Sequence, residues 1–163
     1  MILIGLGANL PGPEGAGPRD TLSAALNDIA AAGVVISGRS GWYATAPVPA
    51  SDQPDYVNAV AALETALDPG ALMDLLHGIE GRRGRVRSTP NAARAIDLDL
   101  LDHHGAISSD WPMLPHPRMH LRAFVLRPLL DVAPDWTHPV SGETGAALLA
   151  RAPDREDVRP LDE

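Results

Sequence analysis

The order of the hydrophobic patterns along residues 2–104 constrains the fold more than any other feature. Four segments have the extended or alternating pattern of strands, and two repeat apolar residues every three or four positions, as amphipathic helices do. In chain order they are residues 2–7, 19–32, 34–45, 55–65, 69–81 and 95–104, with the helical pattern at 19–32 and 69–81. The glycines within 34–45 predict a bulge or bend in that strand. This β-α-β-β-α-β order predicts an α+β fold, a ferredoxin-like sandwich whose antiparallel sheet carries both helices on one face.

The rest of the chain adds smaller elements to this sandwich. Residues 114–134 predict a loop and a helix, and residues 141–152 a short last helix, so we expect additional C-terminal helices or a hairpin. A polar tail from about residue 153 is expected to be loosely ordered. The whole chain, residues 1–163, has the length of a single domain.

Residues 96–100 alternate strictly between apolar and acidic side chains. Because successive side chains of a strand point to opposite faces, Ile96, Leu98 and Leu100 are predicted to face one way. Asp97 and Asp99 then face the other way, roughly 6.5 to 7 Å apart along the strand. Two such carboxylates can converge on a magnesium ion. Alternation alone also places acids on the wet face of a sheet, so the pattern leaves both interpretations open.

The basic residues favour an interpretation that involves phosphate. All 13 are arginines, and those at 82, 83, 85, 87 and 94 fall in one short window before the acidic strand. Guanidinium groups present a planar fork of donors suited to phosphate oxygens. Arginines beside acidic metal ligands are common components of phosphoryl-transfer sites. A solvated, salt-bridged helix end and loop is the alternative explanation of the same charges.

Composition argues against several other classes of protein. A net charge of −8 disfavours general nucleic-acid binding, which depends on a positive field. The absence of cysteine excludes disulfides, thiolate metal sites and a cysteine nucleophile. The apolar residues 1–10 are too short to span a bilayer and lack a basic segment or cleavage site. We therefore expect a cytoplasmic protein without nucleic-acid or membrane partners.

Several motifs, in a fixed order, resemble one known family. They are GLGANL (5–10), YATAPV (43–48), DQPDYVNAV (52–60), IEGRRGRVR (79–87), RAIDLDLL (94–101) and PHPRMHLRAFVLRPL (115–129). The family is 6-hydroxymethyl-7,8-dihydropterin pyrophosphokinase, whose signature is an arginine, any two residues, two aspartates separated by one aliphatic residue, and two further aliphatic residues. The signature is satisfied here by Arg94, Asp97, Leu98, Asp99, Leu100 and Leu101. The resemblance implies a ferredoxin-like enzyme of folate biosynthesis that transfers pyrophosphate from ATP to a pterin alcohol.

The resemblance also implies roles for individual residues. Asp97 and Asp99 correspond to ligands of two Mg²⁺ ions that bridge the ATP phosphates, and they form the catalytic set together with Arg85 and Arg94. The ATP-binding residues implied are His77, Glu80, Arg85, Arg87, Arg94, Leu100, His116 and Arg122. The pterin-binding residues implied are Thr45, Ala46, Val48, Tyr56, Asn58 and Phe124.

General physical chemistry agrees with these implied roles. A pterin is flat with polar edges, so two aromatic faces (Tyr56 and Phe124) and one amide (Asn58) would stack on it and orient it. The substrate hydroxyl would attack the β-phosphorus of ATP and expel AMP, which requires no covalent enzyme intermediate. Positioning, metal ions and arginines can supply most of the barrier reduction. The expected partners are ATP and 6-hydroxymethyl-7,8-dihydropterin, and the expected state is a monomer.

Residues 88–94, STPNAAR, depart from the family pattern. The segment is one residue shorter and lacks the tryptophan and basic neighbour that many members carry; Pro90 stands where a charged residue is usual, and Ala46 replaces a common proline. We therefore expect an active enzyme with an altered loop. Two alternatives stay open: a pterin- or nucleotide-binding module without turnover, and another magnesium-dependent transferase, such as a nucleotidyltransferase, that releases pyrophosphate.

Overall fold

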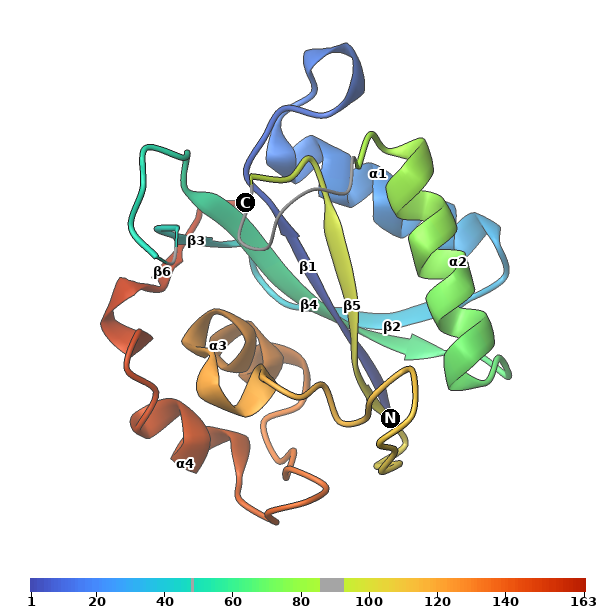
Figure 1. The fold of residues 1–163 in the computed structure, drawn as a ribbon, viewed down its shortest axis with the longest axis vertical. Helices are drawn as coiled ribbons and strands as arrows, with labels where there is room; N and C mark the ends of the chain where they lie inside the picture. The colour runs from blue at the N-terminus through green and yellow to red at the C-terminus, as the bar shows by residue number, and fades with distance from the viewer. Residues whose placement is uncertain (48, 86–92) are drawn as a thin grey trace.

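An antiparallel sheet forms the centre of the computed structural model, which describes residues 1–47, 49–85 and 93–163 (Figure 1). Its strands are β1 (Ile2–Ala8), β2 (Val35–Arg39), β3 (Tyr43–Thr45), β4 (Tyr56–Glu64), β5 (Asp97–His103) and β6 (Arg159–Pro160). The helices are α1 (Pro18–Ala31), α2 (Pro69–Arg82), α3 (Ala123–Val132) and α4 (Gly145–Ala150), with short 3-10 turns η1 (Pro13–Gly15), η2 (Met119–Leu121) and η3 (Arg155–Asp157). The order across the sheet is β5-β1-β4-β3-β6, and β2 also pairs with β4. All these pairings are antiparallel.

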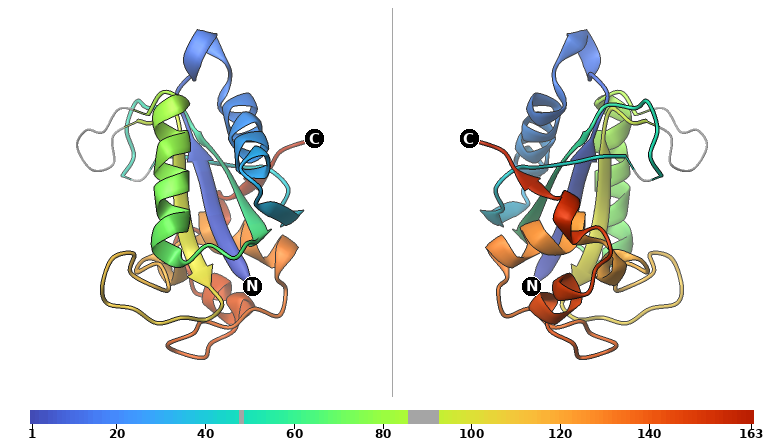
Figure 2. Two further views of the ribbon diagram at one scale, coloured as in Figure 1. Left: turned by 90° about the vertical axis from the view of Figure 1, so that its right-hand side faces the viewer. Right: turned by 90° about the vertical axis from the view of Figure 1, so that its left-hand side faces the viewer.

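Each face of the sheet enters its own apolar core. On β1, Ile2, Ile4 and Leu6 pack beneath α1 and α2, whereas Leu3 packs on the other face with α3. Figures 1 and 2 show α1 and α2 side by side over one face, with α3 and α4 on the opposite side. The prediction of an α+β protein with an antiparallel sheet is confirmed.

Both helices predicted from periodicity form within one residue of the expected limits. In α2, Pro69 occupies the first turn, and the Asp68 carboxylate accepts a hydrogen bond from the Ala71 amide at 2.8 Å, which satisfies one of the free donors at the helix start. Leu72 and Leu76 of α2 are fully buried against the sheet. No helix in the described part of the chain is both long and apolar enough to cross a membrane.

The strand predicted over residues 34–45, with a bulge or bend at its glycines, is irregular beside Gly38 and is divided into two strands, β2 and β3, both paired with β4. The break falls at Ser40. Its amide donates to the carbonyl of Val60 at 2.9 Å, and its hydroxyl accepts from the Val60 amide at 2.9 Å, so a side chain replaces one backbone partner of the ladder. Hydrophobic periodicity does not report such a substitution, because the partner lies 20 residues away.

Residues 153–163, expected to be a loosely ordered tail, contain η3 and the edge strand β6, which pairs with β3. The Arg159 guanidinium forms a salt bridge with the carboxylate of Asp55, the residue just before β4. A two-residue strand that includes Pro160 has no alternation for a sequence pattern to detect.

A buried polar contact joins the C-terminal layer to the sheet. The indole Nε1 of Trp136 donates to Oδ2 of Asp102 at 2.7 Å, and the other carboxylate oxygen accepts from the Gly105 amide at 2.8 Å. Asp102 is only 4% exposed and Trp136 8%. The carboxylate therefore has donors from the fold itself on both oxygens.

Trp136→Phe should lower the free energy of unfolding by ~1–3 kcal/mol, because it leaves a buried carboxylate oxygen without its donor. The measurement is urea unfolding followed by circular dichroism. Trp111→Phe is the matched control, because Trp111 is 60% exposed and should change stability little. Equal effects of the two substitutions would contradict the importance of the indole bond.

Candidate active site

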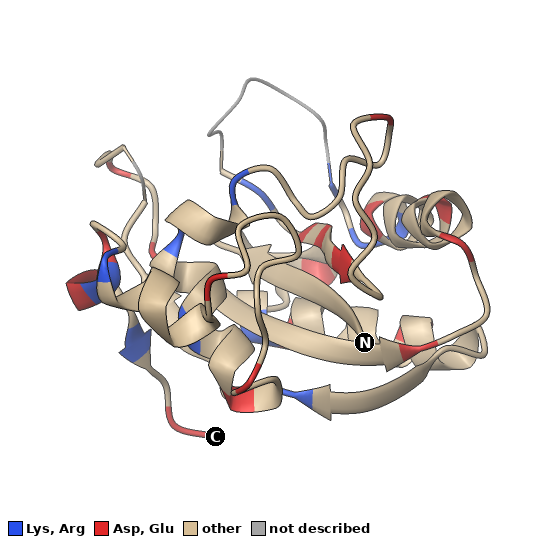
Figure 3. Cartoon of the chain, turned by 90° about the horizontal axis from the view of Figure 1, so that it is seen from below, with Lys and Arg blue, Asp and Glu red and all other residues tan. Residues whose placement is uncertain are grey.

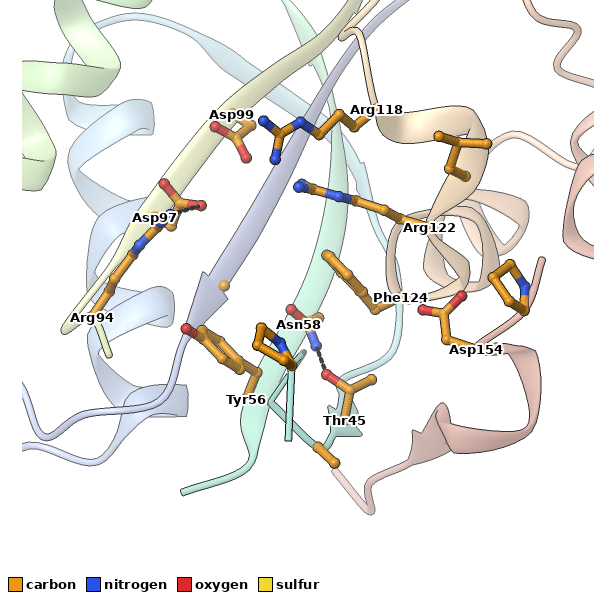
Figure 4. A pocket seen from close by; sticks show the side chains of 15 residues that line it. Thr45, Tyr56, Asn58, Arg94, Asp97, Asp99, Arg118, Arg122, Phe124 and Asp154 are labelled. Carbon is orange, nitrogen blue, oxygen red and sulfur yellow. Dashed lines mark hydrogen bonds and ion pairs between the residues drawn. The ribbon is translucent and has the colours of Figure 1, made fainter. Parts of the chain in front are cut away.

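A cavity of about 380 Å³ opens on the α3 side of the sheet (Figure 4). Its floor is formed by β1, β4 and β5, because α3 covers only the part of this face around Leu3, Val60 and Leu101. The lining residues are Gly7, Thr45, Ala46, Pro49, Tyr56, Asn58, Arg94, Asp97, Asp99, Arg118, Leu121, Arg122, Phe124, Pro153 and Asp154.

Gly7 of β1 keeps the middle of this floor open. Gly5 pairs with Asp99, and Gly7 lies between Asp97 on β5 and Asn58 on β4. A Cβ atom placed on Gly7 would lie 3.2 Å from Oδ1 of Asn58. The absence of side chains here leaves the acidic strand and the polar strand facing one shared space.

The prediction from alternation is confirmed for β5. Ile96, Leu98 and Leu100 are buried in the core beneath α1 and α2, while Asp97 and Asp99 lie on the opposite, partly open face and line the cavity. The aspartates are therefore held at fixed positions by the apolar residues between them.

Arginines neutralise Asp97 from two sides. Nη1 of Arg94 lies 2.9 Å from one carboxylate oxygen of Asp97, and Nη1 of Arg85 donates to the other. Arg85 also donates to Glu80, a fully buried carboxylate on α2 that accepts from the Leu98 amide at 2.9 Å. Glu80 thereby ties α2, Arg85 and the start of β5 together.

The backbone of Arg94 is fixed by Asn9, at the end of β1. Oδ1 of Asn9 accepts from the Arg94 amide at 2.8 Å, and the Asn9 amide donates to the Arg94 carbonyl at 3.0 Å. The Asn9 side-chain nitrogen donates to the Pro54 carbonyl at 3.1 Å. Asn9 is 1% exposed, so it acts as a rigid spacer between the Arg94 segment and the loop that leads into β4.

Asp99 has a different environment from Asp97. Burial, together with the neighbouring charges of Asp97 and Glu80, raises the pKa of Asp99 to about 7. A cation bound in the cavity would stabilise the ionised form of Asp99, because its positive charge offsets both the cost of burying the carboxylate and the repulsion from Asp97 and Glu80.

A second group of cations approaches from the α3 side. Arg118 and Arg122 extend toward Asp97 and Asp99, so the cavity has guanidinium groups on two sides of the acidic pair (Figure 4). Over the chain as a whole, acidic and basic positions are interspersed (Figure 3). The arginines of the cavity are thus a local arrangement in a protein of net charge −8.

His116 stands beside these arginines, outside the cavity lining. Burial and the charge of Arg122 lower the pKa of His116 to about 4, so the imidazole is neutral at pH 7. Its Nδ1 accepts from the Arg118 amide at 3.1 Å, which leaves the proton on Nε2. A neutral Nε2–H group can donate a hydrogen bond to an anion, and because it carries no positive charge it does not form an ion pair with the aspartates.

The other end of the cavity is apolar and aromatic. Tyr56 projects from β4, and Phe124 faces the cavity from α3 (Figure 4). Between them, the Asn58 amide donates to Oγ1 of Thr45 at 2.8 Å, which orients the amide at the cavity floor. The Arg122 guanidinium lies 5.4 Å from the centre of the Phe124 ring. A flat heterocycle with a polar edge matches this end of the cavity.

The structure brings most of the predicted site residues together. Those that line the cavity are Thr45, Ala46, Tyr56, Asn58, Arg94, Asp97, Asp99, Arg122 and Phe124. Arg85 and Glu80 lie just behind the lining: Arg85 donates to the cavity residue Asp97 and to Glu80. His77 lies on α2 beside the Trp111 ring, 6.0 Å between ring centres, and Leu100 points into the helix-side core. Val48 and Arg87 lie outside the described residues, as does most of the altered loop 88–94.

Sequence reasoning missed several cavity residues, namely Gly7, Pro49, Arg118, Leu121, Pro153 and Asp154. Arg118 had a signal, because it lies between His116 and Arg122 in a segment with other candidates. Asp154 had none, since it belongs to a tail without periodicity and reaches the cavity only through the tertiary fold.

The acidic pair fits magnesium that arrives together with phosphates. Among the described residues there is no cluster of three or more His, Asp or Glu side chains that could hold a metal by itself. Mg²⁺ characteristically takes one or two carboxylates and completes its shell with waters and substrate phosphates. Asp97 and Asp99 are a donor set of that kind.

Comparison with protein families matches residues 3–134 to 7,8-dihydro-6-hydroxymethylpterin-pyrophosphokinase (HPPK). The chain belongs to this family. It is 41% identical over 155 residues to a 2-amino-4-hydroxy-6-hydroxymethyldihydropteridine pyrophosphokinase of Pseudomonas aeruginosa. The aligned region covers 93% of this chain and 91% of that protein. With the Synechocystis enzyme of the same name it shares 37% identity over 149 residues, 90% of this chain and 73% of that one.

Longer proteins carry the same unit. The chain is 36% identical over 138 residues to the Pneumocystis carinii folic acid synthesis protein fol1, which covers 84% of this chain but only 18% of that protein. In structure it is similar to Plasmodium falciparum HPPK-DHPS, with a TM-score of 0.66 and 13% sequence identity, over 98% of this chain and 46% of that one. At that identity the structural similarity supports the fold alone.

Asp99→Asn is expected to raise the Tm of the metal-free protein by ~2–4 °C at pH 8 and by less at pH 5. The raised pKa means that the free energy of unfolding of the wild type falls as the pH rises from about 4 to about 7, because the unfolded chain ionises this carboxyl at its ordinary pKa of 3.8. Asparagine removes that penalty.

Scanning calorimetry in EDTA measures the effect, with Glu64→Gln, an exposed acid at the end of β4, as control. A stabilisation that is the same at both pH values would contradict the burial of the Asp99 charge.

Proposed function

We propose that this chain transfers pyrophosphate from ATP to 6-hydroxymethyl-7,8-dihydropterin and releases AMP, in folate biosynthesis. Family membership and the named pyrophosphokinases support the reaction. The observation that carries the assignment is the joint cavity, in which the Tyr56–Asn58–Phe124 end continues directly into the acidic pair and its arginines. A flat acceptor and a polyphosphate bound there would meet over Gly7.

In this proposal the pterin ring lies between Tyr56 and Phe124, with its polar edge on the oriented amide of Asn58. Its hydroxymethyl group then points along the floor toward Asp97 and Asp99. The hydroxyl oxygen attacks the β-phosphorus, the bond to the α-phosphate oxygen breaks, and AMP departs with that oxygen while the hydroxyl proton passes to solvent or a phosphate. Holding both reactants in one cavity replaces a bimolecular collision with a positioned reaction.

The arginines and His116 bind the phosphates in the proposed complex. Arg85 and Arg94 pair with Asp97 in the free protein and donate hydrogen bonds to phosphate oxygens in the complex. Arg122 donates to phosphate oxygens from the α3 side. The neutral His116 donates from Nε2. Asp97 and Asp99 hold Mg²⁺, and we propose two ions; when bound they supply the positive charge that offsets the charge developing on the transferred group.

The strand order supports the finer fold assignment. With β2 and β3 counted as one interrupted strand, the sheet reads last, first, third, second, which is the order expected of a ferredoxin-like sandwich. We propose this fold for the chain as a single domain. A cytoplasmic location and a monomeric state stay predictions from the sequence.

Incubation with ATP, Mg²⁺ and 6-hydroxymethyl-7,8-dihydropterin should yield AMP and the diphosphorylated pterin, both identified by chromatography. ADP as product would indicate a kinase of another type. Pyrophosphate as product would indicate a nucleotidyltransferase, and the absence of turnover would indicate a binding module.

Asp97→Ala should reduce the rate at least ~100-fold while the protein stays folded, because a metal ligand is lost from an open strand face. Glu64→Ala is the control acid, and survival of activity in Asp97→Ala would make the metal assignment wrong.

Gly7→Ala should raise the KM for the pterin about tenfold, equivalent to ~1.4 kcal/mol, because the new methyl group narrows the floor beside Asn58. Gly38→Ala is the matched control, since a Cβ there meets only ordinary contact with Val132 at 3.7 Å. Initial-rate kinetics with the pterin varied at saturating ATP measure both. An unchanged KM in Gly7→Ala would contradict the placement of the pterin over β1.

A further inference from the structure

The helix that carries Phe124 begins without a cap of its own. Arg122 is the N-cap residue of α3 and makes no side-chain bond to the first turn. Its carbonyl accepts from the amides of Val125 and Leu126 at 3.1 and 3.0 Å, but the amide of Ala123 has no partner within the helix. The first amides of any helix lack such partners and need an acceptor from elsewhere.

That acceptor comes from the C-terminal segment. Oδ1 of Asp154 accepts from the Ala123 amide at 3.1 Å, across 31 positions of sequence. An aspartate is among the preferred acceptors at a helix start, because its negative charge also interacts favourably with the helix dipole. Asp154 thus performs for α3 the function that a local cap performs in other helices.

The capped amide lies between two residues of the cavity. Arg122 precedes Ala123 and Phe124 follows it, and both line the cavity, as does Asp154 itself. The guanidinium of Arg122 rests over the ring of Phe124. Whatever fixes the Ala123 amide therefore fixes the backbone from which these two side chains project (Figure 4).

The same segment is also anchored on the opposite wall. After η3 it continues into β6, whose Pro160 and Arg159 pair with Tyr43 and Ala44 of β3. The next residue of β3, Thr45, holds the amide of Asn58 at the cavity floor. Figure 2 shows this C-terminal stretch passing from the α4 side to the sheet. One short segment thus connects the start of α3 to the strand that carries the facing wall.

We propose that Asp154 is a positioning residue of the pterin site: by accepting from the Ala123 amide it sets Phe124 and Arg122 at the correct distance from Thr45 and Asn58. The role rests on the proposed function for the identity of the ligand. It acts through the backbone of α3, so it requires a hydrogen-bond acceptor at position 154 and not a negative charge as such. The family match ends at residue 134, so this part of the site lies outside the matched region.

The test measures binding of 6-hydroxymethylpterin, the oxidised analogue, in the presence of Mg²⁺ and a non-hydrolysable ATP analogue. Asp154→Ala should weaken pterin binding about five- to tenfold, the loss expected when a capped first turn frays. Asp154→Asn, which retains an acceptor oxygen, should stay within about twofold of wild type. Asp157→Ala removes the same charge from η3, where Asp157 is exposed, and should leave binding unchanged. Thermal melting of each full-length variant accompanies the titrations.

Each remaining outcome has a distinct meaning. If the wild type itself fails to bind the pterin, the proposed function fails. If the wild type binds and Asp154→Ala binds equally well, the positioning role is overturned. Equal losses in Asp154→Ala and Asp154→Asn would overturn it too, since they would indicate a direct charge effect on the ligand. Should Asp154→Ala not fold, Asp154→Leu, which keeps the side-chain size and lacks an acceptor, takes its place: a loss in Asp154→Leu but not in Asp154→Asn supports the role, and equal affinities of the two variants overturn it.

Discussion

The site depends on the alternation of side chains in β1, β4 and β5. On all three strands the residues that face α1 and α2 are apolar and buried or partly buried, and this packing fixes the register of β1 against β4 and against residues 97–100 of β5. The intervening positions are then free to carry glycine, asparagine, tyrosine and aspartate on the other face. A shift of one residue in β5 would turn Asp97 into the core, and the same shift in β4 would turn Asn58 into it. The core on one face therefore enforces the chemistry on the other.

Charge balance follows from this geometry. A sheet face that presents Asp97 and Asp99 close together, with Glu80 behind them, would be strongly repulsive on its own. In the structure Arg85 and Arg94 form ion pairs with Asp97, whereas the pKa of Asp99 is raised. The free protein thus compensates the charges of Asp97 and Glu80 with arginines and that of Asp99 with a raised pKa.

Much of this arrangement could be predicted from the sequence, because it depends on local periodicity. Alternation placed Asp97 and Asp99 correctly, and the helical patterns gave the limits of α1 and α2. Alternation also placed the Leu100 side chain in the core, although family resemblance implied a nucleotide contact for this residue. The glycines of residues 34–45 indicated an irregular strand, but the hydrogen bonds of Ser40 and Asp154 could not be predicted, because each joins a side chain to a distant amide. Contacts of this kind leave no trace in hydrophobic patterns.

The glycine floor of β1 has a consequence for inhibition. Between the aromatic end of the cavity and the acidic pair, the floor at Gly7 consists of main chain and carries no side chain. Substitution can remove a side chain that an inhibitor contacts, but it cannot remove backbone atoms, and any residue larger than glycine at position 7 intrudes on the space of Asn58. A compound that fills only this central strip would therefore be hard to escape by mutation, because a change at Gly7 that weakens the compound would, under the proposed function, weaken the pterin as well.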